Sequence, residues 1–186
     1  MLLRISCLVC VLLSITACFV PDLGPVGETG PVPEKSIDVT YEDIDGIWYE
    51  VARLPVAFQD GCLESELVIY RIGPDRPTRL WWDCFGDDSV ASLSGVLAPI
   101  ANHGFRMDFD TKSLHDWFSL KFWVLEKSER VDWLVIGHPG WERLWVLSST
   151  PTMEMEKLED IIHQVETAGH FSPGFLMNRL IVSDSF

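Results

Sequence analysis

The sequence predicts an all-β fold: an eight-stranded antiparallel up-and-down β-barrel with one C-terminal α-helix packed outside it. Two observations support this. Short segments of strand-forming residues recur at even spacing between positions 47 and 149, with turn residues between them. After residue 152 the apolar residues change to a helical period. Eight strands with short connections can close into a barrel wide enough for one small ligand, and closure removes the exposed sheet edges.

The N-terminal residues 1–17 have the composition of a secretory signal: one early arginine, an apolar run, and small residues before Cys18. The apolar run is too short for a comfortable membrane span. The tetrapeptide Ile15-Thr16-Ala17-Cys18 resembles a bacterial lipobox, in which a peptidase cuts before the cysteine and lipids are attached to it. Acyl chains contribute about 0.8 kcal/mol per buried methylene, so they would anchor the protein without a spanning helix. An ordinary signal peptide that contains cysteines is the alternative.

The segment after the cysteine is expected to be a tether. Residues 18–38 comprise the lipidated cysteine and a Pro/Gly-rich stretch without an apolar period, which would span on the order of 25 Å. Phe19 stands where an aspartate would resemble an inner-membrane retention signal. We therefore expect a lipid-anchored protein on the bacterial outer membrane, facing the periplasm. The folded domain is expected at residues 39–183, because the chain suffices for one sizeable core but not comfortably for two.

The net charge limits the possible binding partners, and the positions of the cysteines suggest one disulfide. A net charge of −14 repels phosphate backbones, so no nucleic-acid partner is expected. Cys7 and Cys10 lie in the segment expected to be removed, which leaves Cys62 and Cys84 in an oxidising compartment. A bridge between these two would stabilise the fold by about 3 kcal/mol in the chain-entropy estimate. Two free buried thiols are the alternative.

The first predicted strand begins at Gly46, where the backbone turns in, and it places Trp48 two residues later. If Trp48 points inward, the period of two puts Glu50 and Ala52 on its side and Arg53 on the opposite side. Glu50 would then be a buried carboxylate that needs a partner, or a group that orients a polar lipid head. The eight strands are expected at residues 47–53, 63–71, 78–85, 91–98, 104–110, 118–126, 131–138 and 143–149.

The C-terminal region is expected to contain one helix near residues 153–168, with one apolar face turned to the outside of the barrel. Thr152 is the expected N-cap, and Gly169 the expected end. The tail from residue 170 is apolar in places and is expected to return as a short added strand.

Several separate stretches together resemble one family. They are GIWYEVARLP at 46–55, Phe58-Gln59 followed by Gly61-Cys62, Trp123-Val124 leading to Trp133, and ERLWVLSSTPT at 142–152. The chain resembles a lipocalin, in particular the bacterial outer-membrane lipocalins that are similar to plant temperature-induced lipocalins and apolipoprotein D, over about residues 38–178. The resemblance implies an eight-stranded barrel that holds small hydrophobic molecules in an internal cup, with fatty acids and lysophospholipids as the expected ligands.

Two residues depart from the family pattern. Ser149 stands where an arginine usually covers the tryptophan at the closed end of the barrel, so that contact, worth about 0.5 to 2 kcal/mol, is absent or supplied by another residue. Phe122 stands where the family often has tyrosine, which makes the cup more apolar. With this resemblance, Gly46 and Trp48 become the expected floor of the barrel.

The expected ligand site is an aromatic and apolar wall with few polar groups, which suits an acyl chain. Adjacent Trp81 and Trp82 must face opposite sides, and Trp82 is taken as the inner one, in register with Leu80. Met107 and Phe109 alternate with charged residues and are therefore expected to point inward. The expected ligand-binding residues are Glu50, Ala52, Leu80, Trp82, Met107, Phe109 and Phe122.

An enzyme would need a cluster of acid, base or nucleophile, and the candidate residues are scattered. No catalytic residue, metal site or cofactor is expected. The histidines are expected to be solvated; they are His103, His115, His138, His163 and His170. The favoured function is a non-catalytic carrier, monomeric or homodimeric, for envelope lipid storage, transport or stress response. The alternatives are a lipid-handling or isomerising enzyme on the same barrel, and a structural or partner-docking lipoprotein whose barrel is filled with side chains.

Overall fold

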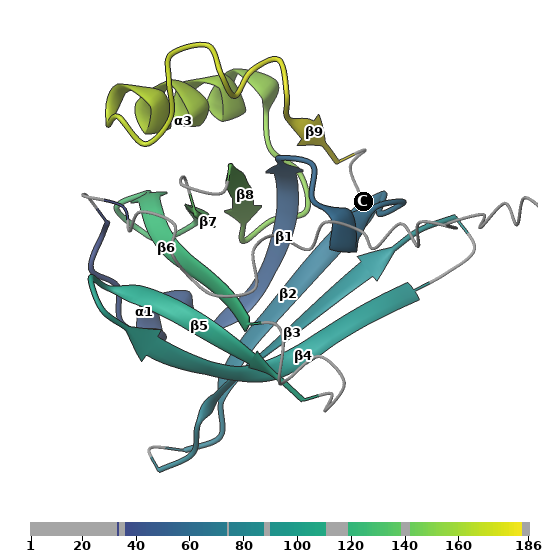
Figure 1. Cartoon of the computed structure of the whole chain (residues 1–186), viewed down its shortest axis with the longest axis vertical. Helices are drawn as coiled ribbons and strands as arrows, with labels where there is room; N and C mark the ends of the chain where they lie inside the picture. The colour runs from purple at the N-terminus through teal and green to yellow at the C-terminus, as the bar shows by residue number, and fades with distance from the viewer. Residues whose placement is uncertain are drawn as a thin grey trace, which may run out of the picture.

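In the computed structural model the protein is described at residues 33, 36–73, 75–87, 90–110, 119–138 and 142–183. Eight antiparallel strands close into a barrel, because β1 pairs with β8 on one side and with β2 on the other (Figure 1). The predicted fold is confirmed, and every strand boundary falls within two residues of its expected position. The strands are β1 (Gly46–Arg53), β2 (Glu64–Arg71), β3 (Thr78–Phe85), β4 (Val90–Ile100), β5 (Gly104–Phe109), β6 (Ser119–Lys127), β7 (Trp133–His138) and β8 (Arg143–Ser148).

The membrane-related predictions concern other parts of the chain. Residues 1–17, Cys18 and most of the tether lie outside the described residues, as does His115. The signal and the lipid anchor therefore stay predictions. Within the described part of the chain, no helix is long and apolar enough to cross a membrane.

One end of the barrel is covered by the segment that precedes β1. This segment contains the short helix α1 (Tyr41–Ile44), which begins with a capping box between Thr40 and Asp43. The amide of Ile37 donates to the carbonyl of Val124 at 2.8 Å, and the hydroxyl of Tyr41 donates to the carbonyl of Leu97 at 3.4 Å. The segment is thus tied to β6 and β4, the two strands that flank β5.

Trp48 packs beneath this cover. Gly46 has φ +132, which lets the chain turn from α1 into β1. The Trp48 indole N–H donates to the carbonyl of Ile44 at 2.8 Å, and the side chain is 3% exposed. Trp48 shares one apolar cluster with Val39 and Ile44. These contacts hold the tryptophan at the end where the sequence placed the floor, and they show how its polar edge is satisfied.

The helix α3 (Met155–Thr167) covers part of the outside of the barrel. Its inner face packs in a second apolar cluster with outward-facing residues of β1, β6, β7 and β8. Its N-cap is Glu154 instead of the expected Thr152, and no side chain caps that end. The expected added strand is present as β9 (Ile181–Val182), which pairs with the end of β1 (Figure 1).

A β-bulge in β1 changes which residues face the interior. Glu50 pairs with Leu147 and Ala52 pairs with Val146, so three residues of β1 oppose two residues of β8. Val51 is the additional residue. Because the bulge shifts the period by one, Arg53 turns to the same side as Glu50, and Ala52 turns away from it.

Candidate functional site

The interior of the barrel contains one large apolar cluster. Its members come from every strand of the barrel and from the segment before β1. Five of the predicted ligand-binding residues belong to it: Leu80, Trp82, Met107, Phe109 and Phe122. Their predicted inward orientation is confirmed, including the choice of Trp82 over Trp81. Trp81 lies outside, stacked on Tyr70 with ring centroids 5.2 Å apart.

The prediction that Ala52 lies on the inner face is wrong. Ala52 packs in the outer cluster, beneath α3. The physical reason is the bulge at Val51, which reverses the alternation that a regular strand would follow. The same bulge makes the assignment of Arg53 to the outer face wrong, since this side chain is 2% exposed and bonded to Glu50.

Three aromatic rings meet at the end of the barrel opposite Trp48. Phe58 comes from the 3₁₀ turn η1 (Ala57–Gln59), in the connection between β1 and β2. Its ring lies 5.7 Å from that of Trp82 and 6.2 Å from that of Trp145, and the two indoles are 5.1 Å apart. The connection therefore places an aromatic side chain in the apolar cluster at the mouth of the barrel.

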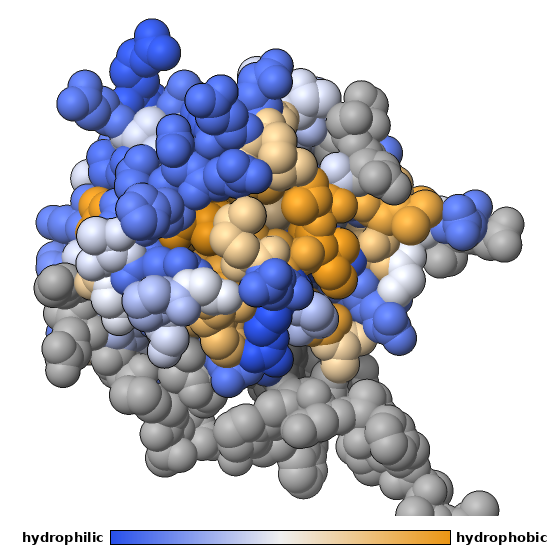
Figure 2. All heavy atoms as spheres, turned by 90° about the horizontal axis from the view of Figure 1, so that it is seen from above, coloured by the Kyte–Doolittle hydropathy of each residue, from blue (hydrophilic) through white to orange (hydrophobic). Residues whose placement is uncertain are grey.

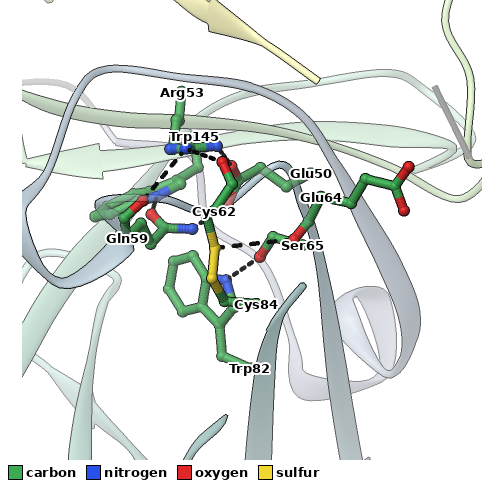
Figure 3. The surroundings of a disulfide bond; sticks show 9 residues. All are labelled: Glu50, Arg53, Gln59, Cys62, Glu64, Ser65, Trp82, Cys84 and Trp145. Atoms are coloured by element: carbon green, nitrogen blue, oxygen red, sulfur yellow. Dashed lines mark hydrogen bonds and ion pairs between the residues drawn. A yellow bond between two sulfur atoms is a disulfide. The ribbon is translucent and has the colours of Figure 1, made fainter. Parts of the chain in front are cut away.

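A buried ion pair lies beside these rings (Figure 3). Nη1 of Arg53 is 2.7 Å from Oε1 of Glu50. Nη2 of Arg53 donates to the carbonyls of Cys62, at 2.8 Å, and Gln59, at 3.4 Å. Arg53 thus holds both the carboxylate on its own strand and the backbone of the connection above it. Of the two roles considered for Glu50, the structure shows the carboxylate paired inside the protein.

Gln59 completes the polar cluster. Its Nε2 donates to Oε2 of Glu50 at 2.6 Å, and its Oε1 accepts the indole N–H of Trp145 at 2.7 Å. The indole N–H of Trp82 donates to the hydroxyl of Ser65 at 2.6 Å. Both buried indoles therefore have hydrogen-bond partners, as buried tryptophans usually require.

The electrostatics of Glu50 are dominated by its position. Burial raises the pKa of Glu50 above its ordinary value, while the guanidinium of Arg53 and the hydrogen bonds from Gln59, Arg53 and Ser65 oppose that shift. Removing a carboxylate from water disfavours its charged form, and the nearby guanidinium favours it. We therefore expect the pKa of Glu50 to change when Arg53, Gln59 or Ser65 is replaced.

The disulfide ties the connection to the sheet. Cys62 and Cys84 are bridged, with their Cα atoms 5.5 Å apart, which confirms the predicted pairing over two free thiols. Cys84 lies at the end of β3, and Cys62 lies just before β2 (Figure 3). The bridge is therefore close to the carbonyl that Arg53 binds, and both features hold the same connection over the mouth.

Sequence reasoning missed the residues that complete this site. Arg53, Phe58, Gln59 and Trp145 were not predicted as site residues. Phe58 and Gln59 do occur in the stretches that carry the family resemblance, which was the available signal. The histidine prediction also needs one correction: His138 is 2% exposed, with its ring 4.9 Å from that of Trp123, so it is buried at the end of β7.

A groove lies outside the barrel, between the start of α3 and β9. Its volume is about 410 Å³ and its walls include Val51, Met153, Leu158 and Val182. The face seen from above carries an apolar patch bordered by hydrophilic side chains (Figure 2).

Within the described residues, no group of three or more His, Cys, Asp or Glu side chains could hold a metal ion.

Known proteins resemble this chain in sequence and in structure. A family model described as "Lipocalin-like domain" matches residues 38–180. A curated protein of Acanthamoeba polyphaga mimivirus, whose name assigns it to the lipocalins, is 27% identical over 154 residues, or 81% of this chain and 86% of the viral protein.

Three solved structures share the fold. Insecticyanin of the tobacco hornworm Manduca sexta aligns with TM-score 0.63 and 16% identity, covering 88% of this chain and 87% of that chain. The cockroach allergen Per a 4 aligns with TM-score 0.62 and 9% identity, covering 85% and 96%. Lobster apocrustacyanin A1 aligns with TM-score 0.56 and 11% identity, covering 78% and 79%. At these identities the likeness concerns the fold alone.

Proposed function

The chain belongs to the lipocalin-like family, whose members bind small hydrophobic ligands, and from this premise we propose a lipid-anchored carrier of fatty acids, lysophospholipids or similar amphiphiles. It acts at the bacterial outer membrane, facing the periplasm, in envelope lipid storage, transport or stress response. Lipocalins are generally binding or transport proteins, so the proposal contains no catalytic step. The membrane part of the proposal depends on residues 1–19 alone.

The apolar interior cluster is the observation that carries the proposal. Its wall includes Leu67, Leu80, Met107 and Leu120, all 0% exposed. Burial of apolar ligand surface contributes about 25 cal/mol per Å², so an acyl chain within this cluster would gain several kcal/mol. Glu50, Arg53 and Gln59 place polar groups at the mouth, where they can select the head of an amphiphile.

Ligand binding is tested with delipidated protein checked by native mass spectrometry, followed by titration with oleate and lysophosphatidylcholine. We expect the tryptophan fluorescence to change, because Trp82 and Trp145 line the interior. Trp82→Phe should remove much of this change, and the matched control Trp81→Phe should retain it, since Trp81 faces outward. If neither ligand binds, the carrier proposal fails and a filled, structural barrel is favoured. Product formation would instead favour an enzyme.

The anchor is tested separately by Cys18→Ala. We expect this variant to move from the membrane pellet to the soluble fraction, because the acyl chains would have no attachment site. Cys7→Ala, in the segment expected to be removed, is the matched control and should stay in the pellet. Retention of the Cys18→Ala variant in the pellet would contradict the lipobox prediction without affecting the ligand proposal.

A further inference from the structure

The carboxamide of Gln59 points into the barrel, although Gln59 belongs to the connection above it. The side chain is 2% exposed and bridges two interior groups: it donates to Glu50 at 2.6 Å and accepts from Trp145 at 2.7 Å. A group in this position must offer one donor and one acceptor on a single planar head. A carboxamide has this property, and so does a carboxyl group that carries its proton.

The position lies at the boundary between the polar mouth and the apolar interior. Glu50 is two residues from Trp48 on β1, and it pairs with Leu147 of the interior cluster. Trp145 contacts Trp82 in the same cluster. An acyl chain within this cluster would bring its head group to the level of the Gln59 carboxamide.

The present occupant of this position can be displaced. Gln59 comes from a one-turn 3₁₀ helix in a connection whose backbone is held by Arg53 and the disulfide, so that displacement concerns the side chain of Gln59 alone. Its two hydrogen bonds can be reproduced by a ligand, so exchange leaves neither Glu50 nor the Trp145 indole without a partner.

We propose that Gln59 occupies the head-group subsite of the barrel, and that the ligand is a long-chain carboxylic acid whose carboxyl group takes this place and shares one proton with Glu50. The inference rests on the proposed function and adds the chemical class of the head group. The Gln59 side chain and the ligand then compete for the same hydrogen bonds to Glu50 and Trp145.

The single proton follows from the charges in the cluster. The one positive charge of Arg53 is already matched by Glu50 at 2.7 Å. Two carboxylates in contact in a buried site cannot both ionise, so the pair holds one proton between them. Burial already raises the pKa of Glu50, which is the direction that favours a proton on this pair. A free fatty acid is an anion at neutral pH, and binding then takes one proton from the solvent.

Other groups face this cluster from the elements packed around it. Uncharged contacts to the pair come from Gln59 and Cys62 in the connection and from Ser65 on β2, and the hydroxyl of Ser183, just after β9, donates to the backbone carbonyl of Glu50. The further charged residues on β2 are Glu64, Glu66 and Arg71, and Arg143 lies on β8, two residues from Trp145. Figure 3 shows the Glu64 side chain pointing away from the cluster.

The test compares three ligands with the same chain length: decanoate, decanamide and methyl decanoate. Isothermal titration calorimetry in two buffers of different ionisation enthalpy gives the number of protons taken up on binding. We expect about one proton for decanoate at neutral pH and none for decanamide, and decanoate affinity should fall about tenfold per pH unit above neutrality. The affinities of decanamide and methyl decanoate should not depend on pH.

Two variants sharpen the test. In Glu50→Gln the partner carboxylate is absent, so decanoate should bind as the anion beside Arg53 with no proton uptake; Glu159→Gln, on the exposed face of α3, is the matched control. Gln59→Ala removes the internal competitor, so decanamide should bind several-fold more tightly. Gln164→Ala, also exposed on α3, should leave the affinity unchanged.

The outcomes separate this inference from the proposed function. Proton uptake with decanoate but not with decanamide supports the inference. Decanoate binding without proton uptake overturns the shared proton, while the carrier function stands. If none of the three ligands binds, and oleate and lysophosphatidylcholine do not bind either, the carrier function fails and the inference fails with it; if only those two bind, the inference fails alone. The wild-type proton count is decisive even if Glu50→Gln does not fold.

Discussion

Arg53→Met should lower the free energy of unfolding by about 3–5 kcal/mol near neutral pH, the usual loss when one partner of a buried ion pair is removed. Arg53 is 2% exposed, and it binds Glu50 and the carbonyls of Gln59 and Cys62. The substitution keeps much of the side-chain volume. The loss therefore comes from a carboxylate that is left buried without its counterion, and urea denaturation measures it.

The same variant should become more stable, relative to wild type, as the pH falls. Without the guanidinium, burial raises the pKa of Glu50 further above its ordinary value of 4.5. The folded state then binds a proton that the unfolded state has lost, so stability falls as pH rises from that value through the folded-state pKa. Lowering the pH toward about 5 should recover part of the deficit.

Two controls isolate the buried charge. Arg130→Met removes an arginine whose side chain is 89% exposed, and it should change stability by less than about 0.5 kcal/mol. The double variant Glu50→Gln with Arg53→Met removes both charges, and it should be more stable than Arg53→Met alone at neutral pH, with little dependence on pH. A deficit in Arg53→Met that does not vary with pH would contradict the role assigned to Glu50.

Replacement of both Cys62 and Cys84 by alanine should lower the free energy of unfolding by about 2–5 kcal/mol, the range for removal of a native disulfide from a small domain. The bridge joins residues 22 apart and fixes the connection that carries Phe58 and Gln59. In the chain-entropy view the unfolded chain gains freedom when the bridge is lost, and in the folded protein the connection loses one attachment. Urea denaturation with and without dithiothreitol measures the stability of the reduced and the oxidised protein.

The double alanine variant also supplies its own control. Dithiothreitol should destabilise the wild-type protein by a similar amount and have no effect on the variant. An unchanged wild-type unfolding curve, with reduction verified by mass spectrometry, would show that the bridge contributes little to stability. The variant should also exchange the backbone amide hydrogens of residues 57–62 faster, because the connection would be held by Arg53 and the side-chain contacts alone.

The fold could be predicted because its determinants are local and repeated. Alternating strand residues and turn residues fix the eight strands, and the change of period fixes α3. The inward orientation of Leu80, Trp82, Met107 and Phe109 followed from the period of two, since β3 and β5 pair regularly with their neighbours. In such regular strands successive side chains point to opposite faces of the sheet, so the alternation in the sequence predicts which side chains point inward.

The mouth could not be predicted in the same way, because it depends on two features without a periodic signal. The bulge at Val51 exchanges the faces of Ala52 and Arg53, and nothing in a run of strand-forming residues marks an extra residue. The contacts of Gln59 depend on how a connection folds over the barrel, which joins residues as distant as Gln59 and Trp145. A family resemblance pointed to Phe58-Gln59, but not to the partners of these side chains.

The pairing of β2 with β3 has a consequence for the order of assembly. This hairpin pairs continuously from Glu64 with Phe85 to Arg71 with Thr78, and Cys84 lies opposite Ser65. The hairpin alone brings the two thiols together, before β1 and β8 have met. The bridge therefore needs only this local hairpin to form and does not require the closed barrel, so we expect a fragment of residues 57–87 to oxidise to the same pairing by itself.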